Sequence, residues 1–241
     1  MIVDSSALLE RACDDIMRSA FNSSGQRCSA LRLLLVHQEV YSELILMLKG
    51  AMNDLTIGIP DDLCTDIGPI ITFEAMEKLD HYLAKMESDG HSLFQVSKEN
   101  VLNNDCWFSP TLIELELSSM PNEEQFGPIL HVASFSEDNL LDSLKKINAM
   151  GFALTFGIHT RIDAKALDIA KEASSGNIYI NRDIVGAVVE TQPFGGKNLS
   201  GSGFKAGGPN YLLQFMDERV ITVNTVAIGG NIDLINLNND N

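Results

Sequence analysis

The fold is decided by the stretch Leu31–Val36, which reads LRLLLV. A run this short and this apolar is typical of a strand that is covered on both faces, as in a parallel sheet. Helical patterns flank it, with apolar residues recurring every three to four positions over residues 8–21 and 40–55. A buried strand between two amphipathic helices predicts an α/β fold.

The same alternation continues along the chain to residue 180. Further extended segments are expected at 2–3, 93–96, 107–113, 128–135, 152–158 and 178–180, and further helices at 72–86, 136–147 and 164–173. Thr72 and Ser136 stand where two of these helices begin, and both residue types are favoured N-caps. Repeated strand–helix units predict a largely parallel sheet with helices on both faces.

The last part of the chain departs from this pattern. Residues 182–210 are rich in glycine and poor in aliphatic residues, and the segment is too long for an idle loop in a compact domain. A short helix is expected at 211–216, and the alternating segment Val220–Val223 predicts an edge strand that can pair with another chain. We therefore expect a main unit over residues 1–209 and a C-terminal region over 210–241.

Composition limits the class of function. The chain has 241 residues, of which 45% are hydrophobic, so it can bury a substantial core. Its 33 acidic residues outnumber 17 basic ones, which disfavours nucleic acid or an anionic membrane as a partner. No apolar run approaches the length that spans a bilayer, and no secretory signal precedes the first helix.

The four cysteines lie far apart in the sequence, at Cys13, Cys28, Cys64 and Cys106. No C-x-x-C pair is present, and no histidine stands at zinc-ligand spacing, so no metal site is expected. Reduced thiols in a cytoplasm are the simplest account of this usage.

The stretch Phe21–Ser29 (FNSSGQRCS) places Cys28 on a short connection between the first helix and the strand. A loop on a rigid scaffold can aim a side chain at a substrate, and a thiol is intrinsically nucleophilic. The alternative is a small buried cysteine without chemistry. Cys13, on the apolar stripe of the first helix, fits that alternative better.

Two other motifs are weaker. Gly201–Ala206 fits the dinucleotide-binding pattern G-x-G-x-x-G/A, but the preceding Lys197–Ser200 is no buried strand. His159 and Asn177 follow Cys28 at intervals similar to those of papain-like proteases, but the sequence around Cys28 lacks that family's signature. A structural histidine at the end of an apolar strand is the commoner case.

Three segments together resemble the aldehyde dehydrogenase family. Gly25–Cys28, Glu124–Pro128 and Pro193–Gly196 are similar, in family order, to its nucleophile, ribose-binding and late substrate-loop motifs. Gly25–Arg32 and Gln192–Pro209 resemble most the Δ1-pyrroline-5-carboxylate (L-glutamate γ-semialdehyde) dehydrogenase branch, including the dehydrogenase module of bifunctional bacterial enzymes of proline catabolism. The resemblance covers essentially the whole chain and implies an α/β catalytic domain followed by an oligomerisation strand.

The resemblance implies a chemistry for the first two motifs. Cys28 would attack the aldehyde carbon, and its backbone N–H would help to hold the oxyanion. The thiohemiacetal would pass a hydride to NAD, leaving a thioester that water hydrolyses. Glu124 would bind the hydroxyl groups of the nicotinamide ribose, and Phe126 would belong to the same cofactor motif.

The resemblance also implies a set of substrate-binding residues. Ser29 and the backbone of Gly186 and Ala187 would anchor the distal carboxylate, because a small residue and free amides suit an anion. Phe194 would pack against the aliphatic part of the substrate. Arg27, next to the nucleophile, belongs to the same set.

The chain also departs from the family's pattern. Family members are about twice as long and carry an NAD-binding domain, a glutamate base and an oxyanion-hole asparagine upstream of the nucleophile. We therefore expect a cytoplasmic fragment that is inactive by itself and forms a homo-oligomer through its C-terminal strand. FAD is expected only where a separate proline dehydrogenase domain precedes. A second interpretation is a non-catalytic scaffold or oligomerisation module that kept the fold.

Overall fold

The computed structural model describes residues 1–97, 106–186 and 191–228. By its internal contacts the chain divides into a large unit, Met1–Tyr211, and a small one, Leu212–Asn241. Each unit is described separately below.

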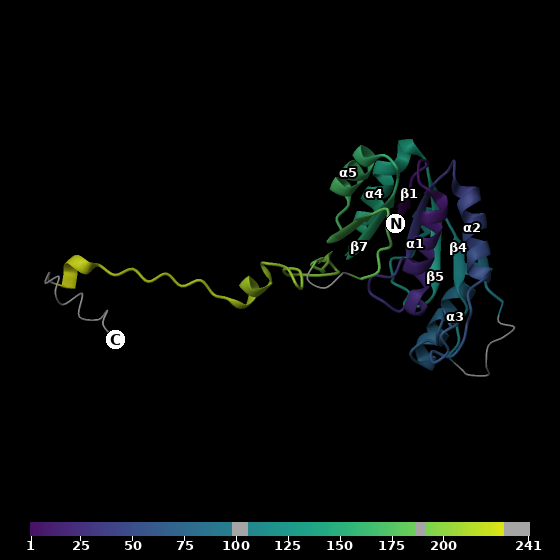
Figure 1. The fold of residues 1–241 in the computed structure, drawn as a ribbon, viewed down its shortest axis with the longest axis horizontal. Coiled ribbons are helices and arrows are strands. Elements are labelled where there is room, and N and C mark those ends of the chain that lie inside the picture. Colours follow the sequence, from purple (N-terminus) through teal and green to yellow (C-terminus); the bar gives the residue numbers. More distant parts are fainter. Residues whose placement is uncertain (98–105, 187–190, 229–241) are drawn as a thin grey trace. The chain divides into compact units, whose positions relative to one another are not determined.

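The large unit is built on a seven-stranded sheet (Figure 1). Its strands are β1 (Ile2–Val3), β2 (Leu33–His37), β3 (Ser92–Gln95), β4 (Thr111–Glu114), β5 (Ile129–Phe135), β7 (Thr155–His159) and β8 (Asn177–Ile180), in the spatial order β3-β4-β5-β2-β1-β7-β8. All neighbouring pairs are parallel except β3 with β4, at one edge. The prediction of a largely parallel sheet is confirmed.

Helices cover both faces of this sheet, as predicted (Figure 1). They are α1 (Leu9–Phe21) and α2 (Tyr41–Asn53) on one face, and α3 (Phe73–Ser88), α4 (Leu140–Ala149) and α5 (Asp163–Glu172) on the other. Alternation along β2 shows why the strand is apolar throughout. Leu34 and Val36 pack with the α1–α2 layer, whereas Leu35 packs with α4 and α5.

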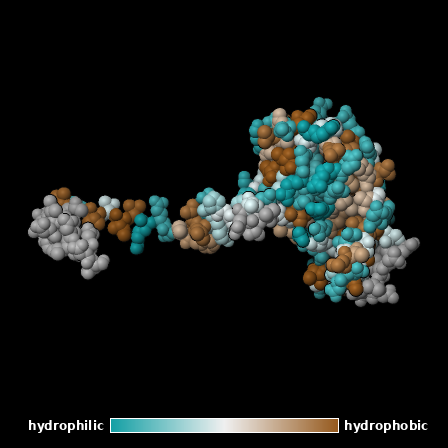
Figure 2. Space-filling view, viewed as in Figure 1, coloured by the Kyte–Doolittle hydropathy of each residue, from teal (hydrophilic) through white to brown (hydrophobic). Residues whose placement is uncertain are grey.

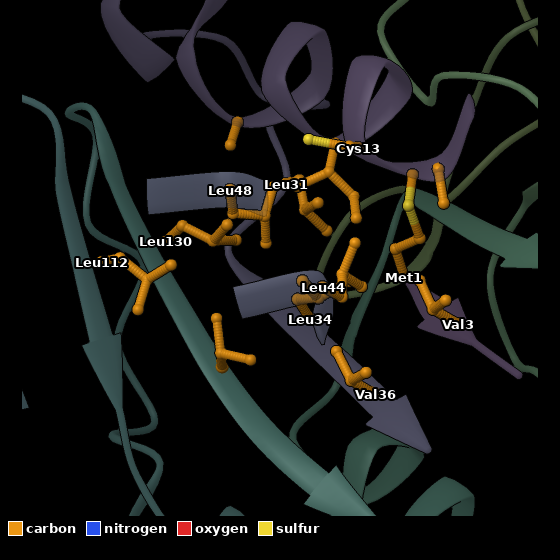
Figure 3. Close-up of a cluster of buried hydrophobic side chains, with 14 of the residues drawn as sticks. Met1, Val3, Cys13, Leu31, Leu34, Val36, Leu44, Leu48, Leu112 and Leu130 are labelled. Carbon is orange, nitrogen blue, oxygen red and sulfur yellow. The ribbon is translucent and has the colours of Figure 1, made fainter. Parts of the chain in front are cut away.

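The main hydrophobic cluster lies between β2 and the first helical layer (Figure 3). Leu34 and Val36 of the strand meet Leu44 and Leu48 of α2, and all four are fully buried. Removing such a leucine side chain from water contributes about 2 kcal/mol. Cys13 of α1 lies in the same cluster, so it is a core residue as predicted.

Two helices begin at the predicted caps. The Thr72 hydroxyl accepts a hydrogen bond from the Ala75 N–H at 3.2 Å. Ser136 and Asn139 form a reciprocal capping box, in which the Ser136 N–H donates to the Asn139 side chain at 2.9 Å. A short 3₁₀ turn, Glu137–Asn139, lies between that cap and α4, so the α-helix proper begins later than predicted.

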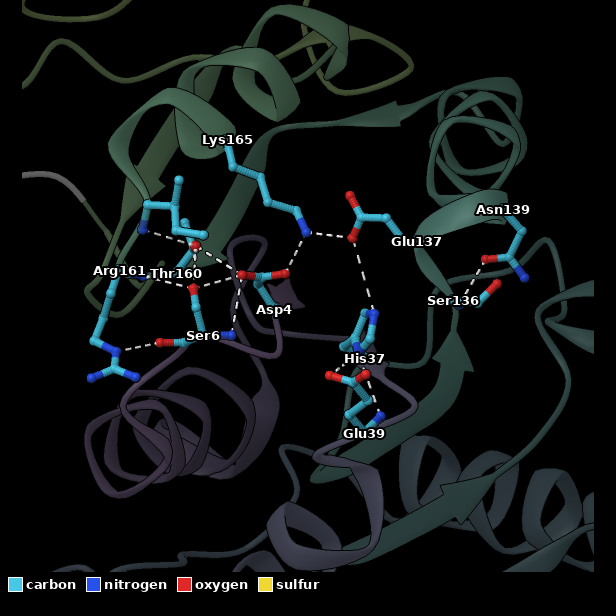
Figure 4. A network of polar contacts seen from close by, with 11 residues as sticks. Asp4, Ser6, His37, Glu39, Ser136, Glu137, Asn139, Thr160, Arg161 and Lys165 are labelled. Carbon is cyan, nitrogen blue, oxygen red and sulfur yellow. Dashed lines mark hydrogen bonds and ion pairs between the residues drawn. The ribbon is translucent and has the colours of Figure 1, made fainter.

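A closed polar network fills the carboxyl-end edge of the sheet (Figure 4). Asp4, directly after β1, is buried and accepts hydrogen bonds from Ser6 Oγ, Thr160 Oγ1 and Lys165 Nζ at 2.6, 3.0 and 2.6 Å. Lys165 also pairs with Glu137, which follows β5. Burial by itself raises the pKa of Asp4, but these hydrogen bonds outweigh it and hold the pKa well below its ordinary range.

The small unit presents apolar side chains to solvent (Figure 2). Exposed residues here are Leu212, Leu213, Phe215, Met216, Val220, Ile221, Val223 and Val226. The described elements are two 3₁₀ turns, Tyr211–Phe215 (which begins at the unit boundary) and Thr225–Ile228. The segment Val220–Val223 is not a strand in the described single chain, because a strand requires a neighbour to complete its hydrogen bonds. Its pairing with another chain stays a prediction.

In the part of the chain that the structure describes, no helix combines the length and the apolar character needed to cross a bilayer.

Candidate active site

Cys28 lies on the connection between α1 and β2, as predicted, and it is exposed. The preceding turn is strained, since Ser23, Ser24 and Gly25 have φ values of 55°, 54° and 63°. Non-glycine residues rarely adopt this left-handed conformation, and each such residue costs about 1 kcal/mol or more. Gly25 has no alternative, because a Cβ there would lie 2.1 Å from the carbonyl oxygen of Gly127.

Hydrogen bonds to a neighbouring loop hold this strained turn in place. Ser24 Oγ donates to the Gly68 carbonyl at 2.8 Å, and Gln26 Nε2 donates to the Pro69 carbonyl at 3.1 Å. The Gln26 Oε1 atom accepts from the Ile71 N–H at 2.8 Å. The surroundings therefore determine the position of the turn, which is the condition for backbone strain to persist.

Arg32 connects the turn to the segment that carries Glu124. Its Nη1 atom donates to the carbonyls of Gly25 at 2.7 Å and Gly127 at 3.3 Å, and Nη2 donates to the Arg27 carbonyl at 3.0 Å. The guanidinium carbon lies 4.6 Å from the centre of the Phe126 ring. Sequence reasoning missed this residue, although a lone charge in the apolar run LRLLLV was a usable signal.

The charge of Arg32 is set by its surroundings. Burial lowers the pKa of Arg32 to about 10, and the nearby Glu124 and Cys28 act in the opposite direction. The side chain therefore stays cationic at neutral pH. It also brings Cys28 and Glu124, far apart in the sequence, within electrostatic reach of one cation.

A buried histidine fixes the backbone beneath Arg32. The Arg32 carbonyl accepts from the N–H and from Nδ1 of His131, at 3.0 and 2.8 Å. The Nε2 atom lies 2.7 Å from the Tyr82 hydroxyl. Burial lowers the pKa of His131 to about 4, so the ring is neutral. Since a carbonyl only accepts, Nδ1 carries the proton and Nε2 accepts from Tyr82.

The thiol opens onto a cavity at the amino ends of β2, β5 and β7. Its charged lining side chains are Arg32, Glu123 and Glu124, and part of its apolar wall is formed by Phe152, Leu154, Phe156 and Ile184. Cys28 and Glu124 thus share one cavity, which combines a nucleophile, carboxylates and a cation with an apolar surface. Such a mixture is characteristic of small-molecule sites.

Two of the predicted substrate residues meet next to the nucleophile. The Gly186 N–H donates to Ser29 Oγ at 3.2 Å, and the Gly186 carbonyl accepts from the Tyr179 hydroxyl at 3.2 Å. The segment before Gly186 is held to α1, because the Ile184 N–H donates to Ser19 Oγ at 3.1 Å. Ala187 lies outside the described residues.

Phe194 lies on a separate bridge and is not among the described residues that line the Cys28 cavity. It pairs with Ala206 through two backbone hydrogen bonds of 3.0 Å. Asn177 braces this loop, donating to the Pro193 carbonyl at 2.9 Å and accepting from the Gly195 N–H at 3.1 Å. Arg27 is exposed, and its carbonyl rather than its side chain contacts Arg32.

The two disfavoured motifs do not form sites among the described residues. His159 is buried with Nε2 3.8 Å from Asp15 Oδ2, and it is not among the residues lining the Cys28 cavity. Gly201–Ala206 follows a two-residue strand, β9 (Lys197–Asn198), which pairs with β6 (Phe152–Ala153) and is exposed. No α-helix follows the glycines within the described part of the chain.

All four cysteines are free thiols. Over residues 1–97, 106–186 and 191–228, no group of histidine, cysteine and acidic side chains is placed to hold a metal ion.

Comparison with known sequences gives a consistent result. The sequence model of the "Aldehyde dehydrogenase family" matches residues 1–221. The "Bifunctional protein PutA" of Klebsiella aerogenes is 46% identical over 224 residues, which cover 91% of this chain and 17% of that protein. The "1-pyrroline-5-carboxylate dehydrogenase" of Bacillus subtilis (strain 168) is 33% identical over 222 residues, covering 91% of this chain and 42% of the relative.

Solved structures agree with the sequences. A mutant of Bradyrhizobium japonicum proline utilization A (PutA) superposes with a TM-score of 0.86 at 45% identity, covering 95% of this chain and 23% of that one. The glyceraldehyde-3-phosphate dehydrogenase GapN of Methanocaldococcus jannaschii, complexed with NADP, gives a TM-score of 0.77 at 25% identity over 88% and 45%. The chain thus spans less than half the length of each of these relatives.

Proposed function

This chain belongs to the aldehyde dehydrogenase family, and from that premise we propose that it carries the nucleophile and substrate-holding residues of an NAD-dependent L-glutamate γ-semialdehyde dehydrogenase. The observation that carries the proposal is the exposed Cys28 on its strained turn, in one cavity with Glu124. Similarity to proteins named PutA and 1-pyrroline-5-carboxylate dehydrogenase supports the substrate.

Cys28 captures the aldehyde. Its sulfur forms a bond to the carbonyl carbon, the thiol proton passes to solvent water, to which Cys28 is exposed, and the carbonyl π electron pair moves to oxygen. The backbone N–H of Cys28 makes no hydrogen bond within the described residues, so it can donate to this developing oxyanion. Capture as a thiohemiacetal divides one difficult oxidation into two easier steps.

Glu124 and Phe126 fit the ribose and nicotinamide side of NAD. No donor among the described residues reaches the Glu124 carboxylate, so its oxygens can accept from the ribose hydroxyls. Phe126 is 46% exposed and offers an apolar surface beside it. When bound beside Glu124 and Phe126, NAD would supply the hydride acceptor that oxidation of the thiohemiacetal to a thioester requires. Water then hydrolyses the thioester, which releases glutamate and restores the Cys28 thiol.

Ser29, Gly186, Ala187, Arg27 and Phe194 hold the substrate in this proposal. Ser29 Oγ accepts from the Gly186 amide, which leaves the hydroxyl proton for the distal carboxylate of the substrate. Phe194 packs against the aliphatic carbons of the substrate in this proposal.

Alkylation of the purified chain tests the nucleophile. We expect iodoacetamide to modify Cys28 about tenfold faster than Cys64, which is also an exposed free thiol. L-glutamate γ-semialdehyde should protect Cys28, and propanal, which lacks the carboxylate, should protect it less. Cys28→Ser should remove the fast reaction. Equal labelling of Cys28 and Cys64 would instead favour the non-catalytic scaffold.

Reduction of NAD tests how far the chain acts by itself. Because it spans less than half of its relatives, we expect no NAD-dependent oxidation of L-glutamate γ-semialdehyde by the purified chain. Sustained NADH production, followed by absorbance, would contradict this expectation. In this proposal no residue of this chain binds FAD.

We also propose that Val220–Val223 pairs with a second copy of the chain. The support is the alternating sequence together with the exposure of Val220, Ile221 and Val223. Light scattering should show an oligomer that Ile221→Lys dissociates. Equal mass of both proteins would refute the pairing. The four free thiols support a cytoplasmic location.

A further inference from the structure

We propose that Arg32 is a positioning residue that locks the Cys28 turn to the Glu124–Pro128 segment and places a cation next to the thiol. This inference rests on the proposed roles of Cys28 and Glu124. It concerns a residue that takes no part in the chemical steps described above.

The geometry requires an arginine rather than any cation. One planar guanidinium reaches the carbonyls of Gly25, Arg27 and Gly127 while its face stacks on Phe126. A lysine has a single nitrogen and no flat face, so it cannot make these contacts together. Replacing Arg32 with lysine therefore keeps the charge and removes the lock.

The two segments that Arg32 joins are already in van der Waals contact. A Cβ at Gly25 would meet the Gly127 carbonyl oxygen at 2.1 Å, so neither backbone can approach the other further. The Arg32 backbone cannot shift to compensate, because His131 donates twice to its carbonyl. Loss of the guanidinium therefore leaves the turn and the Glu124 segment free to separate.

The charges around the thiol give Arg32 its second role. The side-chain charges that line the cavity with Cys28 are Arg32, Glu123 and Glu124. Met1 also lines the cavity, and its backbone nitrogen donates to the Leu33 carbonyl.

Without Arg32 the thiol would face two carboxylates. A cation favours the thiolate that reacts, and carboxylates disfavour it. Arg27, the remaining cation next to Cys28 in the sequence, is exposed to solvent, where its charge is screened.

The test measures iodoacetamide alkylation of Cys28 by mass spectrometry between about pH 6 and pH 10, together with hydrogen exchange of residues 22–28 and 124–128. Arg32→Met should slow alkylation at neutral pH about tenfold and move its pH profile upward. Arg32→Lys should keep the pH profile but, like Arg32→Met, speed hydrogen exchange in both segments. Arg161→Met is the matched control, because Arg161 is exposed at the opposite edge of the sheet and donates to Ser6.

An unchanged pH profile in Arg32→Met, or unchanged exchange in both variants, would overturn the inference. If Arg32→Met does not fold, hydrogen exchange in Arg32→Lys alone shows whether Arg32 holds the two segments together. The proposed function fails separately, when Cys28 of the unmodified chain reacts no faster than Cys64.

Discussion

The sheet has one edge formed by the carboxyl ends of its parallel strands and another formed by their amino ends. The polar groups at these two edges differ in whether they are paired with other groups of the chain. At the carboxyl-end edge, the hydrogen bonds that Asp4 accepts all come from this chain's own Ser6, Thr160 and Lys165. At the amino-end edge, Cys28 is exposed and faces a cavity. Ligands in open α/β sheets usually bind at the carboxyl ends of the strands. Here the polar groups around Asp4 at the usual edge pair with one another, whereas the exposed thiol lines a cavity at the other edge, so unused groups locate a site better than topology does.

Strain and unsatisfied groups occur at both edges, since the carboxyl-end edge holds Asn181 at a φ of 55° and the buried Nε2 of His159, which has no hydrogen-bond partner among the described residues. The amino-end edge holds Ser23 and Ser24 in left-handed conformations, and the buried Nε of Arg32 has no hydrogen-bond partner among the described residues. Both features cost stability that tertiary contacts must supply. At the amino-end edge, part of this cost goes to holding the Cys28 turn in position.

Removing Asp4, at the centre of the polar network at the carboxyl-end edge, should have the largest effect on stability. Asp4→Ala removes the buried acceptor of hydrogen bonds from Ser6, Thr160 and Lys165, and should lower the free energy of unfolding by about 3–5 kcal/mol in urea titrations, although Lys165 keeps Glu137 as a partner. Asp142→Ala is the control, since its bridge to Lys145 lies on the surface and is worth less than about 1 kcal/mol. Cys28 alkylation should be unchanged while the chain is folded. A loss of Cys28 reactivity in folded Asp4→Ala would show that the edges are coupled.

Adding a Cβ at Gly25, at the amino-end edge, should also lower stability. Gly25→Ala places a Cβ 2.1 Å from the Gly127 oxygen at a positive φ, and should destabilise the chain by about 2–3 kcal/mol. Gly90→Ala has a similar φ of +85° but no atom within 4 Å, so it should cost only about 1 kcal/mol. Thermal and urea unfolding measure both. Equal losses would mean that the contact between turn and Glu124 segment is loose.

The two edges should lose their contributions to stability in different pH ranges. His131 has a pKa of about 4 when folded and about 6.5 when unfolded, so the unfolded chain binds its proton first as the pH falls. Its contribution is complete above about pH 6.5 and is lost between about pH 6.5 and pH 4, at a cost of about 3 kcal/mol. Asp4, with its pKa held low, loses its contribution only below about pH 4.

The variant His131→Asn should flatten the loss of stability between pH 7 and pH 4 in urea titrations. Burial also lowers the pKa of His159 to about 4, so His159 still contributes to the pH dependence of stability in that variant. His81→Asn is the control, because His81 is exposed. A slope that His131→Asn leaves unchanged would mean that this ring is not held neutral.

Losing the contact between the Arg32 guanidinium and the Phe126 ring should have the smallest effect on stability. Phe126→Leu removes the ring 4.6 Å from the guanidinium carbon of Arg32 and should cost about 0.5–1 kcal/mol in urea titrations. Phe126→Tyr keeps the ring face and should change little. If leucine and tyrosine are equally tolerated, the hydrogen bonds of Arg32 hold the turn without help from the ring.

Local patterns predicted the scaffold well, for physical reasons. The strand within Leu31–Val36 and the caps Thr72 and Ser136 depend on burial and on side-chain chemistry close in sequence. The observed strand starts later, at Leu33, because Leu31 and Arg32 form the approach from the Cys28 turn. Alternation in Val220–Val223 could indicate a strand face but could not supply the neighbour that a strand needs.

The site was less predictable than the fold. Cys28 and Glu124 are almost a hundred residues apart, and only the family resemblance suggested that they belong together. The left-handed Ser23 and Ser24 follow from packing of the turn on Gly127, which no local pattern encodes. The roles of Arg32 and His131 depend on the same long-range packing, so residue type alone did not reveal them.

The strand β1 has a consequence for the order in which the molecule assembles. It is two residues long, and it pairs with β2 on one side and with β7 on the other, joining Ile2 to Leu35 and to Ile158. Until β1 docks, the sheet consists of two separate parts, each with an unpaired edge. Because these partners are so distant in sequence, we expect the joining of the two parts to be a slow, late step, before which the unpaired edges are open to association with other chains.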